Sequence, residues 1–276
     1  QYYRCADVLK RLDADLRRIG WSPFPVPLGV MLDESDPQRS RCIRCGTCDG
    51  YPCLVSAKSD AQVVCVDPAL RHTGVSLLTG ARVLRLDTTA SGREIAAVVV
   101  ERGGERERYT ADIVVVSCGA INSAALLLRS ATDRHPHGLA NGSGVVGRHY
   151  MGHINSVLLA ISTTPNPTVF QKTLAVNDFY FGDEEFPFPM GHISFVGKLD
   201  AVALSAGAPS IVPGMTLDLM ARHSLDFWLT SEDLPHPDNR VELDREGRIV
   251  LRYTPNNGDG HARLIRRLEH ALQHGL

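Results

Sequence analysis

Four closely spaced cysteines are the densest group of chemically reactive side chains in the sequence. They follow the pattern C-x₂-C-x₂-C-x₄-C and are Cys42, Cys45, Cys48 and Cys53. Thiolates two residues apart can converge on one metal ion or cluster, and the first three cysteines match the start of a ferredoxin-type run. The last spacing is longer than in that run, and zinc ribbons separate their two C-x₂-C pairs by more residues. Three interpretations stay open: an iron–sulfur cluster, a zinc ion, or a cysteine-rich loop without a ligand.

A glycine after an apolar run is the second candidate. Gly119 follows Cys118 and precedes Ala120, at the point where an expected strand passes into an expected helix. Without a Cβ, glycine lets backbone N–H groups approach a phosphate or ribose, and the helix dipole adds partial positive charge there. A tight strand–helix turn without a ligand would have the same sequence, so both interpretations remain.

The stretch 142–147 spells G-x-G-x-x-G, but its surroundings do not fit a dinucleotide site. That fingerprint needs a strand before it and a helix after it. Here P-H-G-L precedes at 136–139 and R-H-Y follows at 148–150. We interpret the stretch as a glycine-rich connector, and no other part of the sequence supplies the fingerprint.

The first half of the chain is expected to combine helices with a β-meander. Apolar residues at helical spacing predict a helix over 8–19 that Gly20 ends. Alternating and β-branched residues predict strands at 75–78, 83–86, 95–100 and 106–109. The run 112–117 is apolar throughout, which predicts a strand buried on both faces, central in a parallel sheet, with a helix over 122–129 after it.

Beyond a loop over 133–152, the pattern favours an antiparallel sheet. Strands are expected at 154–161, 191–196, 226–229, 240–243 and 249–253, the last two as a hairpin. A final amphipathic helix carries Leu264, Ile265, Leu268, Ala271 and Leu272. The fold class is therefore α/β with α+β character, and the chain divides into residues 1–152 and 153–276.

Composition excludes several functional classes. Of the 276 residues, 43% are hydrophobic and 22% charged, and the net charge of −2 gives no field that would attract nucleic acid. No apolar run reaches the roughly 18 residues of a membrane span. An odd total of 7 cysteines, clustered locally, favours a metal or structural cysteine site in a cytoplasmic protein over a secreted disulfide framework.

Several stretches together resemble the glucose–methanol–choline (GMC) oxidoreductase family of flavoproteins. The run 113–130 resembles the family's strand, glycine and helix at the ADP half of FAD, and 145–153 resembles its crossing into the substrate domain. V-S-L-L-T-G-A-R-V at 75–83 resembles the segment whose last valine meets the adenine, and N-R-V-E-L at 239–243 resembles a substrate-domain strand. The cysteines and Ala57-Lys58-Ser59 occupy the place of a family cysteine motif. Each motif is short, but all occur in the family's order.

The resemblance implies an FAD-dependent oxidoreductase that oxidises a CH–OH group of a small alcohol or sugar by hydride transfer to flavin. It assigns FAD contacts to Val83, Cys118, Gly119 and Ala120, within part of a Rossmann-like domain over 1–152. Residues 153–276 would form part of the antiparallel substrate domain. Some bacterial members hold an iron–sulfur cluster near the cysteine motif, so Cys42, Cys45, Cys48 and Cys53 stay metal candidates.

Two family hallmarks are absent from the sequence: the N-terminal G-x-G-x-x-G unit and the C-terminal catalytic histidine region. With Gln1 as the first residue, we expect this chain to be a middle portion, inactive and unable to retain FAD by itself. No residue is assigned as catalytic. Two alternatives remain: an iron–sulfur or zinc electron-transfer or structural module built on the cysteines, and a degenerate paralogue without catalysis.

Overall fold

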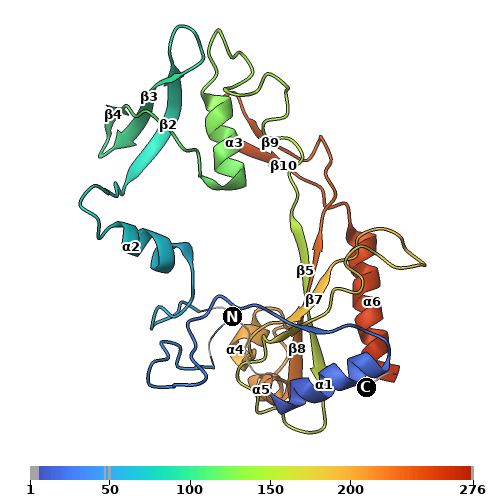
Figure 1. Cartoon of the computed structure of the whole chain (residues 1–276). Coiled ribbons are helices and arrows are strands. Elements are labelled where there is room, and N and C mark those ends of the chain that lie inside the picture. The colour runs from blue at the N-terminus through green and yellow to red at the C-terminus, as the bar shows by residue number, and fades with distance from the viewer. Residues whose placement is uncertain (1–5, 47, 49–50, 275–276) are drawn as a thin grey trace. The chain divides into compact units, whose positions relative to one another are not determined.

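The computed structural model describes residues 6–46, 48 and 51–274 and divides the chain into two compact units. Unit 1 consists of residues 1–75, 153–232 and 257–276, and unit 2 of residues 76–152 and 233–256. Each unit is built from segments distant in sequence (Figure 1).

Unit 1 is organised around a three-stranded antiparallel sheet with the order β5-β8-β7. The strands are β5 (His153–Ile161), β7 (His192–Phe195) and β8 (Ser224–Glu232). The register pairs His153 with Glu232 and His192 with Thr230. The strands expected at 154–161, 191–196 and 226–229 are thus confirmed, with β8 longer at both ends.

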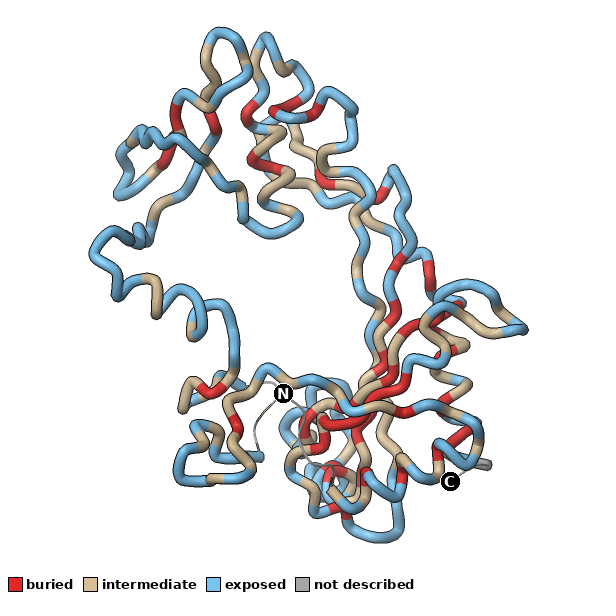
Figure 2. Tube along the Cα trace, in the orientation of Figure 1, coloured by how far each residue is buried: buried red, intermediate tan, exposed pale blue. Residues whose placement is uncertain are grey.

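One face of this sheet packs on two helices, α1 (Asp7–Arg18) and α6 (Gly258–His274). Their leucines share one hydrophobic cluster with the inward residues of β7 and β8, and Figure 2 shows buried positions along these strands. The fully or nearly buried members include Leu9, Leu16, Leu264, Leu268, Ile193, Phe227 and Leu229. Burying each such side chain contributes about 1.5–3 kcal/mol, which makes this cluster the main stabilising core of unit 1.

Helix α1 follows directly from its sequence. Leu9, Leu12 and Leu16 recur at helical spacing and are all buried, while the charged residues between them stay outside. Gly20 has a φ of +89°, and the amide of Trp21 reaches back to the carbonyl of Leu16, so the helix ends as the sequence predicts.

The remaining elements of unit 1 are short. Strand β1 (Phe24–Pro25) pairs with β6 (Leu174–Ala175). The helical segments are η1 (Gln62–Val66), α2 (Asp67–Ala69), α4 (Ala201–Ser205) and α5 (Gly214–His223). None of these was predicted. All of them are shorter than the roughly 11-residue window in which hydrophobic periodicity can be recognised.

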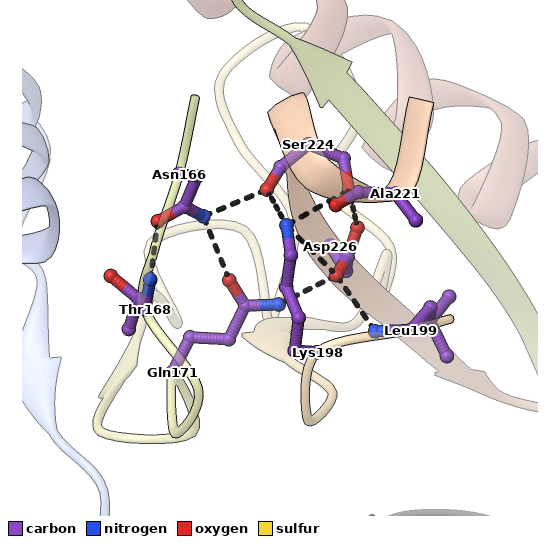
Figure 3. Close-up of polar contacts among 8 residues, drawn as sticks. All are labelled: Asn166, Thr168, Gln171, Lys198, Leu199, Ala221, Ser224 and Asp226. Carbon is purple, nitrogen blue, oxygen red and sulfur yellow. Dashed lines mark hydrogen bonds and ion pairs between the residues drawn. The ribbon is translucent and has the colours of Figure 1, made fainter. Parts of the chain in front are cut away.

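A buried polar network surrounds Asp226, which is 0% exposed (Figure 3). Its carboxylate accepts hydrogen bonds from Ser224 Oγ at 2.5 Å, Gln171 Nε2 at 2.8 Å and the Leu199 amide at 3.1 Å. Lys198 Nζ lies 3.9 Å from the same carboxylate and also donates to Ser224. Desolvation lowers the pKa of Lys198, and the nearby Asp226 charge opposes that effect. The network ties two loops, those that carry Gln171 and Lys198, to the start of β8.

Unit 2 combines a β-meander, a helix and a hairpin. The meander is β2 (Ala81–Thr88), β3 (Ile95–Arg102) and β4 (Glu105–Tyr109), and the helix is α3 (Gly119–Arg129). The hairpin is β9 (Arg240–Leu243) with β10 (Ile249–Arg252). Leu86, Leu126 and Leu139 form its small core, and Ser130 Oγ accepts the Leu86 amide at 2.9 Å. The strands predicted at 83–86, 95–100, 106–109, 240–243 and 249–253 and the helix predicted at 122–129 are confirmed.

Two predicted strands are wrong. The run 112–117 belongs to no sheet among the described residues, and Ile113 and Val115 are 80% and 79% exposed. Val114 and Val116 pack on the core, whereas no described segment covers the face that carries Ile113 and Val115. The stretch 75–78 is also not a strand, and Val75, Leu77 and Leu78 are exposed. All strand pairs in the described part of the chain are antiparallel.

The division expected at residue 152 does not separate the two compact units, because each unit contains segments from both sides of it. The described residues up to 75 cluster with the sheet of unit 1, and residues 233–256 cluster with the meander of unit 2. The roles assigned to residues 1–152 and 153–276 stay predictions. Within the described residues, no helix has the length and apolar character required to span a bilayer.

Candidate functional site

The face of the β5-β8-β7 sheet opposite the helices carries polar and aromatic side chains. Because side chains alternate along a strand, residues paired across the sheet share one face. The register places two rows there, one with Asn155, Thr230 and His192 and one with Val157, Trp228 and Ser194. Glu232 and His153 form the next pair toward the strand end. The inward positions Phe227, Leu229 and Ser231 are buried, so the outer face is a distinct surface.

This outer face forms one wall of a cavity of about 510 Å³. Its other wall comes from the turn after β6, where Tyr180 and Phe181 make an edge-to-face ring contact with centroids 5.0 Å apart. The side chains that give the cavity its chemical character are Tyr180, Phe181, His192, Trp228, Thr230 and Glu232. Aromatic walls with a few polar groups are typical of small-molecule sites.

A glycine brings the rim of this cavity close to β8. Gly191 has a φ of +136°, and a Cβ there would collide with the carbonyl oxygen of Thr230. Only glycine tolerates both the backbone conformation and this approach. The next residue, His192, therefore lies on the outer face of the sheet, paired with Thr230.

Hydrogen bonds fix two of the polar side chains. His192 Nδ1 lies 2.6 Å from Asn177 Oδ1, and because an amide oxygen only accepts, Nδ1 carries the proton. Burial lowers the pKa of His192, which favours the neutral ring with Nε2 as an acceptor. On the same row, Thr230 Oγ1 donates to Asn155 Oδ1 at 2.9 Å.

The four residues predicted to contact FAD lie in unit 2. Gly119 is the first residue of α3, has a φ of +78°, and has no atom within 4 Å of the position a Cβ would take. Cys118 and Ala120 flank it and are exposed, and the Cys118 amide is already bonded to Ser123 Oγ at 3.0 Å. The start of α3 is thus open, which fits a phosphate or sugar group approaching backbone N–H groups.

Val83 lies on β2, the strand that packs against α3. Its pairing with Val100 is followed by a register shift before Arg85, a bulge that locally disrupts the ladder. β2 and α3 both begin at the same end of unit 2 (Figure 1). Val83 and Gly119 are therefore on elements that run side by side in the same direction, as one bound nucleotide would require.

Within the part of the chain that the structure describes, the four cysteines are not arranged as a metal-binding group. Cys42, Cys45, Cys48 and Cys53 line one pocket of about 100 Å³, but no group of three or more His, Cys, Asp or Glu side chains among the described residues is placed to hold a metal ion.

The thiols at the two ends of the motif contact backbone amides instead. The Arg44 amide donates to Cys42 Sγ at 3.5 Å, and the Ala57 amide to Cys53 Sγ at 3.2 Å. The Ala57 contact is the main reason that the pKa of Cys53 is lowered. The predictions of an iron–sulfur cluster and of zinc therefore have no support, and we propose neither.

The stretch 142–147 is a series of turns with no helix after it, so the prediction that it is not a dinucleotide fingerprint is confirmed. Asn141 Oδ1 accepts the Val146 amide at 3.0 Å, and Gly147 packs so closely on the Val241 carbonyl that a Cβ would lie 2.5 Å from its oxygen. The close approach gives Gly147 a structural role.

Comparison with known proteins relates the chain to one enzyme family. Residues 27–155 match the family model of GMC oxidoreductase. The chain is 32% identical over 257 residues to paromamine 6'-oxidase of Streptomyces fradiae, and the match covers 87% of this chain and 45% of that protein. It is 26% identical over 245 residues to the fructose dehydrogenase large subunit of Gluconobacter japonicus, and this match covers 85% of this chain and 44% of that protein.

These relatives are named as an oxidase and a dehydrogenase, so the similarity is to oxidoreductases. The chain belongs to the GMC oxidoreductase family. It spans a little under half the length of these curated relatives.

The cavity residues on the sheet were not predicted individually, although the sheet itself was. Trp228 and Thr230 alternate with buried Phe227 and Leu229, and this alternation is the signal that could have separated the two faces. Tyr180 and Phe181 come from an irregular turn and had no such signal.

Proposed function

We propose that this chain is part of an FAD-dependent oxidoreductase that oxidises a CH–OH group of a small alcohol or sugar. The observation that carries the proposal is the aromatic and polar cavity on the sheet of unit 1, in a chain of the GMC oxidoreductase family. Relatives named for the oxidation of paromamine and of fructose support the substrate class. Neither the metal-module alternative nor the non-catalytic alternative has comparable support.

Unit 2 is assigned to the nucleotide. The backbone at Cys118, Gly119 and Ala120 would face the sugar–phosphate part of FAD, and the backbone of Val83 would face the adenine. FAD, when bound, would supply the acceptor for the hydride of the C–H bond. The open space at Gly119 and the exposed start of α3 support this assignment.

Unit 1 is assigned to the substrate. His192 Nε2 and Thr230 present hydrogen-bonding groups to hydroxyls, and the rings of Trp228 and Tyr180 can pack on the C–H faces of a sugar. These side chains bind and orient the substrate, and none of them is proposed to take its proton.

The nucleotide assignment is tested with Gly119→Ala in the complete protein. The added methyl group meets no protein atom, so it would reduce FAD content by occupying the space of the nucleotide. Gly103→Ala is the matched control, because Gly103 also has a positive φ of +61° and open surroundings but lies in the β3–β4 turn. Flavin absorbance per protein is expected to fall at least about tenfold in Gly119→Ala alone, equivalent to about 1.4 kcal/mol of binding. Equal flavin content in both variants would refute the assignment.

A further inference from the structure

The cavity of unit 1 holds one carboxylate whose negative charge is not balanced by a neighbouring cation. Glu232 is its only acidic lining residue among those the structure describes, and no lysine or arginine lines the cavity there. Glu232 is exposed, and in the same unit Asp183 is paired with Arg267 at 2.7 Å and Asp226 with Lys198 at 3.9 Å. No ion pair of Glu232 occurs within the described residues.

Glu232 is held by one neighbour. Tyr180 Oη lies 3.4 Å from Glu232 Oε1 and donates toward it, which leaves Oε2 as an acceptor. His153 is paired with Glu232 across the strands, and His192 lies one row further along. Since burial favours the neutral form of His192, that ring does not balance the charge.

The rest of the cavity wall suits a cation as well. Trp228, Tyr180 and Phe181 line the same space as Glu232. Aromatic faces attract ammonium groups through their quadrupoles, most strongly for Trp, and the attraction increases when water is displaced. A carboxylate that shares a cavity with three aromatic rings has the chemistry that attracts a protonated amine.

We propose that Glu232 and the rings of Trp228 and Tyr180 bind the ammonium group of an amino-substituted sugar or alcohol. The inference rests on the proposed function, because it names the substrate class of the same cavity. Thr230 and His192, on the adjoining row, contact hydroxyl groups of the same molecule. Glu232 is a specificity-determining residue and takes no part in hydride or proton transfer.

The test compares two sugars that differ by one group, methyl 2-amino-2-deoxyglucoside and methyl glucoside, at about pH 6.5 where most of the amine is protonated. The flavin-loaded complete protein is expected to oxidise the amino sugar with at least about tenfold higher kcat/KM. Glu232→Gln should lower kcat/KM for the amino sugar about 10- to 100-fold and leave the neutral sugar within about twofold, as for a lost charged hydrogen bond. Glu184→Gln, which removes an exposed carboxylate outside the cavity, should change neither value.

Two results would overturn the inference while leaving the oxidoreductase proposal standing: equal oxidation of both sugars by the wild type, or an unchanged preference in Glu232→Gln. Binding is measured separately by calorimetry. Amino-sugar binding that Glu232→Gln abolishes, without oxidation of either sugar, would support the amine site and contradict the proposed reaction. Failure of the amino sugar both to bind and to react would reject the inference.

Discussion

Removing the charge of Asp226 should destabilise the protein far more than removing any exposed carboxylate. Its side chain is fully buried and accepts hydrogen bonds from Gln171, Ser224 and Leu199, with Lys198 close by. In Asp226→Asn the shape is retained and one amide oxygen can still accept from Gln171 and Leu199. The amide nitrogen can donate to Ser224 Oγ, so most of the hydrogen-bonding pattern survives. The main loss is the counter-charge of Lys198.

Breaking a buried pair by removing one partner costs about 3–5 kcal/mol. Because Lys198 retains 15% side-chain exposure and its Nζ also donates to Ser224, the lower part of that range applies. We expect Asp226→Asn to reduce the free energy of unfolding by about 3 kcal/mol. Asp218→Asn is the control, since Asp218 forms an exposed ion pair with Arg222 within α5, and such pairs contribute about 0.3–0.5 kcal/mol.

The measurement is urea unfolding of the complete protein, followed by far-ultraviolet circular dichroism at neutral pH. Adding Lys198→Met to Asp226→Asn should recover part of the loss, because it removes the unbalanced charge. The network does not act as described if Asp226→Asn reduces the free energy of unfolding by under about 1 kcal/mol. The same follows if the double variant loses the full sum of the two single-variant losses.

Two further predictions concern the sheet of unit 1. His261 is buried, its Nδ1 donates to Ser231 Oγ and its Nε2 accepts from Ser156 Oγ, both at 2.8 Å, and burial lowers its pKa. The unfolded chain therefore binds more protons at this position than the folded chain, so the free energy of unfolding should fall as the pH drops below about 6.5. His261→Gln should flatten that pH dependence, measured by urea titrations at a series of pH values. Gly191→Ala would push a methyl group against the Thr230 carbonyl. It should reduce the free energy of unfolding by about 2 kcal/mol or more and so lower the melting temperature by several degrees. Gly207→Ala, which adds a methyl group in open space, should leave the melting temperature unchanged. Equal melting temperatures for these two glycine variants would mean that the close approach at Gly191 is not needed.

Periodic elements were predictable, because their pattern is written in consecutive residues. The leucines of α1 and the alternation in β5 and β8 mark one buried face each, and hydrophobic burial then selects that face. The run 112–117 shows where this reasoning fails. Its uniformly apolar composition suggests burial on both sides, but periodicity does not reveal whether a neighbouring strand is present. Among the described residues, one side is covered and the other is exposed.

The candidate sites divide in the same way. The glycine at the start of α3 was predictable, because Gly119 has a local physical reason there, a φ of +78° in an open position; its contact with FAD stays a prediction. The cysteine spacing shows which thiols can converge but not where the backbone turns them; the Ala57 amide, for example, contacts Cys53 Sγ. The cavity required the register of three strands and the position of a turn at 178–181, and no local pattern contains that information.

Strand β8 is anchored at both ends by buried polar side chains, and this explains how its outer face can serve as a binding surface. At its start, Asp226 is fixed by Gln171 and Leu199; at its end, Ser231 Oγ donates to the Met190 carbonyl and accepts from His261. Hydrophobic contacts alone would hold the inner face but permit sliding along the strand, since apolar packing is not directional. Hydrogen bonds at two points along the strand fix its register. Trp228 and Thr230 lie between the two anchors, so their side chains are positioned before any ligand arrives, which reduces the entropy lost on binding.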